Sequence, residues 1–110
     1  MVFIFKEVLW IISKLYNKIL KAMEVAMDLE EFDTKSISKE TFGLTEARWS
    51  RIIAMLANEG YLTGIEIWNS FDCGYPKVAL SRPEITIKGL EYLEQNSLMK
   101  RAAEMAKGIK

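Results

Sequence analysis

From residue 45 the sequence reads Thr45-Glu-Ala-Arg-Trp-Ser-Arg-Ile-Ile-Ala-Met-Leu-Ala-Asn-Glu-Gly60, and it continues at once with Tyr61-Leu-Thr-Gly-Ile-Glu-Ile-Trp68. The first run predicts a helix, because Thr45 can cap its N-terminus and Gly60 can end it in the left-handed conformation. Its apolar residues recur at the spacing of one core-facing stripe: Trp49, Ile52, Ile53 and Leu56. The second run alternates as a half-buried strand does. Residues 45–68 therefore predict a helix followed directly by a strand.

A turn and a second strand follow this pair of elements. Residues 69–76 contain Asn, Ser, Asp, Gly and Pro, which favour turns. Val78 to Leu80 then predicts a short strand that pairs with residues 61–67. The sequence thus predicts a two-stranded hairpin directly after the helix.

Two further helices flank this unit and complete the layout. Ser36 to Gly43 predicts a short helix that Ser36 caps and Gly43 stops. Thr86 predicts the cap of a later helix, which we expect to end at Asn96 and Ser97. Helix, turn, helix, two-stranded wing and helix is the layout of a winged helix-turn-helix domain. The predicted fold is therefore mainly α with a small β-hairpin wing (α+β).

Extended helices are expected at both ends of the chain. Residues 1–27 predict one long helix, in which residues 1–12 form an apolar N-terminal extension. Three aromatic side chains of this extension are candidate interaction residues: Phe3, Phe5 and Trp10. Residues 97–110 predict a basic C-terminal helix with an apolar stripe. We expect residues 1–110 to form a single domain.

The apolar extension admits three interpretations: packing against the chain's own core, a homodimer contact, or attachment to a membrane surface. A membrane-spanning helix is not among them, because Lys6 and Glu7 interrupt a run that would need about 20 apolar residues. A signal peptide would carry its positive charge before the apolar run rather than after it. We expect no membrane partner and a homodimer formed through the first helix, with the last helix as a further candidate contact.

Composition excludes several classes of function. The chain has 110 residues, of which 15 are basic and 15 acidic, so the positive net charge of many nucleic-acid-binding proteins is missing. It has no histidine, which removes the usual zinc sites and the Ser-His and Cys-His pairs of many hydrolases. Its one cysteine, Cys73, cannot form an internal disulfide, which suits a reducing cytoplasm. We expect neither catalysis nor a bound metal or cofactor.

The candidate DNA contacts lie on the 45–60 helix and on the wing. All are polar or basic side chains that we expect to face outward: Arg48, Ser50, Arg51 and Asn58 from the helix, and Lys77 and Arg82 from the wing. On a helix in a major groove, Arg51 and Asn58 can hydrogen-bond base edges, and Arg48 or Ser50 can reach phosphate. Arginines on an outward helix face are also common as solvated surface, so both interpretations stay open.

Three aromatic residues lie in or beside the turn of the wing: Trp68, Phe71 and Tyr75. They can stack on bases, bind a protein, or fold back on the wing and on the first helix. The last of these is our expectation. We retain all three as candidate interaction residues.

Several motifs resemble those of a known family. They are Gly43-Leu-Thr-Glu46, Glu59-Gly-Tyr-Leu-Thr-Gly64 before the hairpin, and Ile85-Thr-Ile-Lys-Gly-Leu-Glu-Tyr-Leu-Glu-Gln-Asn96 before a basic tail. The chain from about Ser13 to Lys110 resembles the YjcQ family, small winged-helix proteins of Gram-positive bacteria and their prophages; the apolar extension departs from that pattern. The resemblance implies a winged-helix fold and a phage-related DNA-binding role inferred from that fold. It brings no catalytic residues.

Two classes of function follow. The first is a DNA-binding or transcription-regulatory protein that binds double-stranded DNA through the helix and the wing. The layout favours this class, and the zero net charge opposes it. The second is a protein-interaction module on the same scaffold, since a fold does not fix a function. Binding to DNA should weaken steeply with salt, whereas an apolar contact should barely respond.

Overall fold

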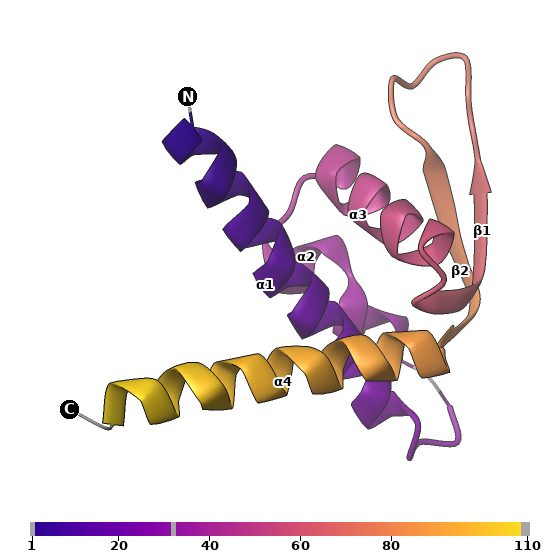
Figure 1. Cartoon of the computed structure of the whole chain (residues 1–110). Helices are drawn as coiled ribbons and strands as arrows, with labels where there is room; N and C mark the ends of the chain where they lie inside the picture. The colour runs from indigo at the N-terminus through magenta and orange to yellow at the C-terminus, as the bar shows by residue number, and fades with distance from the viewer. Residues whose placement is uncertain (1, 32, 109–110) are drawn as a thin grey trace.

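The computed structural model is mainly helical with one antiparallel hairpin, as the sequence predicts (Figure 1). It describes the backbone of residues 2–31 and 33–108, and the side chains of residues 12–98 other than 32, together with 101, 102, 104 and 105. In chain order the elements are α1 (Val2–Ala26), the 3-10 turn η1 (Thr34–Ile37), α2 (Lys39–Phe42), α3 (Glu46–Asn58), β1 (Leu62–Trp68), β2 (Lys77–Ile85) and α4 (Ile87–Gly108).

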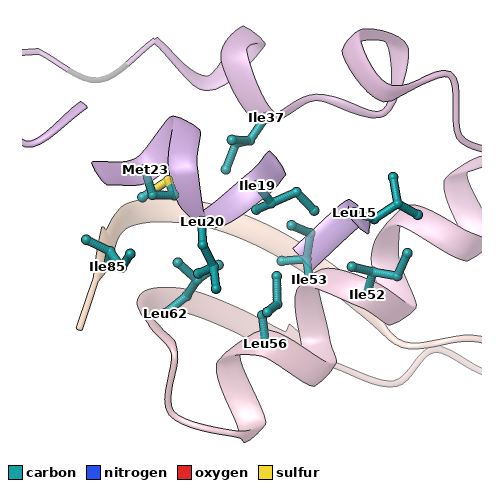
Figure 2. Close-up of a cluster of buried hydrophobic side chains, with 10 residues drawn as sticks. All are labelled: Leu15, Ile19, Leu20, Met23, Ile37, Ile52, Ile53, Leu56, Leu62 and Ile85. Carbon is teal, nitrogen blue, oxygen red and sulfur yellow. The ribbon is translucent and has the colours of Figure 1, made fainter. Parts of the chain in front are cut away.

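The core lies where α1, α3 and the base of the hairpin meet (Figure 2). Its fully buried side chains come from three elements: Ile19, Leu20 and Met23 of α1, Ile37 of η1, and Ile52, Ile53 and Leu56 of α3. Leu62 and Ile85 close the core from the two strands, which pair at these positions. Burying each such side chain contributes about 1.5–3 kcal/mol, so this cluster holds the hairpin base against the helices.

The short helices before α3 are capped by residues other than the one predicted. Asp33 caps η1 by accepting a hydrogen bond from the Lys35 backbone, and Ser38 caps α2. The prediction that Ser36 caps a single helix up to Gly43 is wrong, because the chain makes two short turns there instead of one. Gly43 ends α2 at φ 65°, in the left-handed region that was predicted for it.

The two ends of α3 match their prediction. Thr45 accepts a hydrogen bond from the backbone N–H of Arg48 at 3.2 Å. At the other end Gly60 adopts φ 84°, and its N–H donates to Ala57. The N–H of Tyr61 donates to Leu56, which completes the hydrogen-bond pair of a Schellman motif.

The hairpin is longer than predicted, and it is irregular at its base. Trp68 pairs with Lys77, so both residues lie in the ladder and not in the turn. Near the core the register shifts between Thr63 and Ile65, and Gly64 takes φ 77° at this bulge. A side chain at Gly64 would overlap the backbone carbonyl of Arg82, so the bulge requires glycine.

Helix α4 begins at the predicted cap but does not stop where we expected. Thr86 accepts a hydrogen bond from the Gly89 N–H and donates one to the Gly60 carbonyl, which ties the start of α4 to the end of α3. The predicted end at Asn96 and Ser97 is wrong. These residues have only modest costs inside a helix, and Asn96 is held by a hydrogen bond from its side-chain amide to Asn17 of α1.

Two helical segments extend beyond the core. The N-terminal half of α1 and the C-terminal half of α4 project from the body of the molecule in Figure 1. Between these projections the two helices cross, where Tyr16 of α1 lies 6.3 Å from Tyr92 of α4, centroid to centroid. The projections explain why the principal extents, 55 × 43 × 23 Å, are unequal.

Candidate nucleic-acid interface

The exposed side of α3 carries three of the predicted DNA contacts. Arg48, Arg51 and Asn58 are exposed and share one side of the helix with Met55. From Arg48 to Asn58 this exposed stripe extends for about 15 Å along the helix axis. The opposite sides of α3 pack on α1 and on both strands. The stripe is thus the only broad side of α3 left open by the described residues.

Ser50 does not belong to this stripe, and its predicted outward orientation is wrong. Only 2% of Ser50 is exposed, and Ala54, one turn later, is buried as well. The reason is that α3 packs on α1 and also on the hairpin, so its buried surface is wider than a single stripe. Small side chains at these two positions permit that close packing. Ser50 therefore cannot reach a phosphate.

The turn of the wing lies against the N-terminal half of α3. The guanidinium of Arg51 donates a hydrogen bond from Nη2 to the carbonyl of Gly74 at 3.1 Å. The hydroxyl of Tyr75 donates to Oε2 of Glu46 at 3.4 Å. We call the residues that meet here the wing–helix cluster: Glu46, Arg51, Cys73, Tyr75 and Lys77. The cluster joins α3 and the wing into one surface.

Two cations flank the aromatic ring in this cluster. The Arg51 guanidinium lies 5.9 Å and the Lys77 ammonium 5.7 Å from the centroid of the Tyr75 ring. Cys73 affects the titration of its neighbours. Its hydrogen bond is the main cause that raises the pKa of the Tyr75 hydroxyl, and its Coulombic interaction is the main cause that raises the pKa of Lys77. Arg51 and Lys77 are therefore positively charged together at neutral pH.

Arg82 lies apart from the other candidate contacts. It is exposed on β2, next to the bulge, whereas Lys77 begins the same strand at the turn. Five residues of extended chain separate them by about 17 Å. The structure therefore brings Lys77 together with Arg51 and leaves Arg82 at the base of the wing.

The aromatic residues of the wing differ in how far they are exposed to solvent. Phe71 is fully exposed at the turn, so the expectation that it folds back is wrong, and Trp68 is about half exposed. Tyr75 does fold back, but onto α3 and not onto the first helix. Ser70 donates a hydrogen bond to Asp72 across Phe71, and this bond is the main cause that lowers the pKa of the Asp72 carboxyl. The turn thus presents Phe71 on a short hydrogen-bonded loop.

The remaining sequence predictions fall outside this surface. Phe3, Phe5 and Trp10 belong to α1, but their side chains lie outside those that the structure describes. In the described part of the chain, no three acidic or cysteine side chains gather as metal ligands. Neither is there, among these residues, a helix with the length and apolarity that crossing a membrane requires.

Sequence reasoning missed two members of the wing–helix cluster. From the sequence, Glu46 is only part of the predicted helix and of the Gly43-Leu-Thr-Glu46 motif, and Cys73 is only a thiol that cannot form an internal disulfide. A partial signal exists for Cys73, because Cys73, Tyr75 and Lys77 alternate along the chain and alternate residues of an extended segment share one side. No local pattern points from this segment to Glu46, which is 29 residues away from Tyr75.

Comparison with known proteins addresses the family of the chain. Searches of curated proteins and of solved structures give no match. A family model described as "YjcQ protein" matches residues 16–110. The matched region contains the C-terminal part of α1 from residue 16, all of α3, the wing and the described part of α4. On this match the chain belongs to the YjcQ family.

Proposed function

We propose that this protein binds double-stranded DNA through the exposed stripe of α3 and the adjacent wing, in a regulatory role. The observation that carries the proposal is the wing–helix cluster, which holds Arg51 and Lys77 around one ring beside the open side of α3. An α-helix fits the major groove, which is about 12 Å wide, and a wing beside it can follow the phosphate backbone.

The residues divide by the contacts that they are placed to make. Asn58 lies on the stripe at the end of α3 farthest from the turn of the wing, where its amide can pair with an adenine edge. Arg48 and Lys77 supply charge for phosphates. Arg51 donates to the Gly74 carbonyl through Nη2, which leaves other guanidinium N–H groups for a base or a phosphate. The negative charge of Glu46 repels the phosphates of DNA. It therefore limits the affinity for DNA and disfavours binding in other registers.

Location in the cytoplasm belongs to this proposal. DNA of a bacterial cell is in that compartment, and a single unpaired cysteine, Cys73, is compatible with its reducing conditions.

Titration of a fluorescently labelled random-sequence duplex, by anisotropy at several salt concentrations, tests the proposal. We expect affinity to fall steeply with salt, because each phosphate contact contributes a slope of about −0.9 in log–log form. Arg48→Ala, Arg51→Ala and Lys77→Ala should each weaken binding and reduce that slope by about one unit. Arg101→Ala is the matched control, since Arg101 is exposed on the projecting half of α4.

Two outcomes would count against this function. Absence of binding at about 100 µM and low salt contradicts it, because non-specific DNA affinities reach that range even at physiological salt. An equal loss in Arg101→Ala and Arg51→Ala would place the contact elsewhere on the chain.

A second function is favoured by one specific observation, the exposure of the wing aromatics. Phe71 and Trp68 are the side chains that a protein partner would cover, and Ile67 beside them is partly exposed as well. Binding of this kind should persist at high salt. It should be lost in Phe71→Ala and Trp68→Ala while Arg48→Ala leaves it unchanged, which is the reverse of the pattern expected for DNA.

A further inference from the structure

Helix α1 carries a buried stripe and, beside it, a second stripe of mainly apolar residues that packs on the core only at Leu15 and Ala22. Ile19, Leu20 and Met23 form the buried stripe. The second stripe lies on another side of α1, and its positions alternate three and four residues apart: Leu15, Lys18, Ala22, Val25 and Leu29. Val25 and Leu29 are each 57% exposed. Helix α1 ends at Ala26, and turn hydrogen bonds from the N–H of Met27 to Glu24 and from the N–H of Leu29 to Ala26 follow its last residue.

The spacing of the second stripe continues towards the N-terminus. The sequence places Ile11, Val8 and Ile4 at the same alternation of three and four residues, and the backbone is one helix from Val2 to Ala26. An apolar repeat with a mean spacing of 3.5 residues, sustained from residue 4 to residue 29, is typical of a helix that pairs with another helix. We call these positions the α1 seam.

An open groove runs along the described part of the seam. Its volume is about 590 Å³, and it lies between α1 and the short helix α2. Its floor is apolar, and its lining is contributed mainly by α1: Leu15, Asn17, Lys18, Lys21, Ala22 and Val25, with Thr41 and Phe42 from α2. A groove beside a heptad-like stripe is a site for the apolar side of a second helix.

The charges beside the seam indicate which helix fits. Lys18 lies in the N-terminal part of the described seam, whereas Asp28, Glu30 and Glu31 follow its C-terminal end. Lys21 and Glu24, between these groups, pair with each other at 2.7 Å. A helix that runs antiparallel to α1 and carries the same charge order would place its acidic end against Lys18. Helix α1 of a second copy has this charge order.

We propose that two copies of this chain associate through their α1 seams, antiparallel and about a twofold axis near Ala22. Each copy then fills the groove of the other, which is the self-complementary contact of a symmetric dimer. In this register Lys18 of each copy lies beside the partner's Val25 and near the partner's acidic end. A lysine within an apolar seam disfavours other registers, as a polar residue at a single seam position does in coiled coils. The proposal is independent of DNA binding, since it uses no residue of α3 or the wing.

Sedimentation equilibrium of the full chain, from about 1 µM to about 1 mM, tests the association. We expect a monomer–dimer equilibrium. Val25→Lys should weaken it at least about tenfold, because each dimer would place both new ammonium groups beside the partner's Lys18. The matched control is Met27→Lys, which adds the same charge two residues away. Met27 is 61% exposed but lies outside the seam, so this variant should dimerise like the wild type.

Cysteine cross-linking tests the orientation. In a Cys73→Ser background, Ala22→Cys should form an intermolecular disulfide under mild oxidation, because residue 22 lies near the proposed axis. Leu29→Cys should not cross-link with itself, because in an antiparallel pair the two copies of residue 29 are about 21 Å apart along the axis. A disulfide needs Cα atoms within about 7 Å.

Each alternative result would contradict a different part of the proposal. A monomer at every concentration overturns the proposal. Equal dimerisation of wild type and Val25→Lys, with unchanged circular dichroism, places the interface away from the seam. Efficient cross-linking of Leu29→Cys overturns the antiparallel arrangement in favour of a parallel pair. Should Val25→Lys fail to fold, the two cysteine variants still decide the question.

Discussion

The base and the turn of the wing belong to the same hairpin, but the base is packed against the core and the turn is exposed. At the base Leu62 and Ile85 are buried and paired, and Gly64 fits a bulge against the backbone of β2. At the turn Phe71 is fully exposed, and Gly74 has open space around its Cα. The base is therefore determined by packing, whereas the turn is free to present side chains to a partner. Stability should depend on the first and binding on the second.

The largest difference in stability between base and turn should come from adding a methyl group at the base of the wing. Gly64→Ala would combine a left-handed backbone with an overlap onto the Arg82 carbonyl, and we expect a loss of about 3 kcal/mol or more of unfolding free energy. The same substitution at the turn, Gly74→Ala, meets no atom within 4 Å. We expect a change within about 0.5 kcal/mol there. Urea unfolding followed by circular dichroism measures both, and equal losses would refute the division.

A second pair of substitutions tests the same comparison by removing one large side chain from the base and one from the turn. Leu62→Ala removes a side chain that is buried among α1, α3 and β2, so we expect a loss of about 2–5 kcal/mol. Phe71→Ala removes a larger side chain that touches solvent, and we expect less than about 0.5 kcal/mol. The same unfolding experiment applies. A large loss for Phe71→Ala would mean that the aromatic turn is structural.

A smaller effect is expected where the base of the wing joins α4. Thr86→Ala removes the cap of α4 together with the hydrogen bond to the Gly60 carbonyl, and we expect a loss of about 1–2 kcal/mol. Thr63→Ala is the control, because Thr63 is an exposed threonine on the neighbouring strand. Thermal unfolding should separate the two variants, and equal midpoints would show that the cap contributes little.

The smallest effect concerns the titration of the turn. The hydrogen bond with Cys73 raises the pKa of the Tyr75 hydroxyl, so Cys73→Ala should move this pKa back towards the ordinary value for tyrosine. Because the folded pKa lies above the unfolded one, this interaction stabilises the fold below pH 10 and is lost as the pH rises through the folded pKa. Ultraviolet difference titration against a Tyr75→Phe reference measures the shift. An unchanged titration would mean that Cys73 does not contact the hydroxyl.

The comparison of base and turn also separates what sequence can predict from what it cannot. The apolar stripe of α3 and its caps at Thr45 and Gly60 were predictable, because helix periodicity and capping are local properties. The hairpin and the start of α4 at Thr86 were predictable for the same reason. Each of these signals depends on residues within a few positions of one another.

The errors occurred where distant segments decide the outcome. Ser50 was placed outward because a small polar residue is compatible with a surface and also with close packing against a second element. Asn96 resembled a helix end, but its contact with Asn17 comes from a helix 79 residues earlier. The contact of Tyr75 with Glu46 likewise depends on how the turn folds over α3. Local patterns do not contain these tertiary contacts.

The unbroken course of α4 has a mechanical consequence. Its 22 residues form a rod about 33 Å long, joined at one end to the last turn of α3 through Thr86 and crossed further along by α1 at Asn17. A tilt of about 10° about the contact with α1 at Asn96 would displace the far end, about 18 Å away, by about 3 Å. Helix α4 is thus a lever between the two ends of the molecule. Reorientation of α3 and the wing at one end would be amplified at the other, and the contact with α1 is its fulcrum.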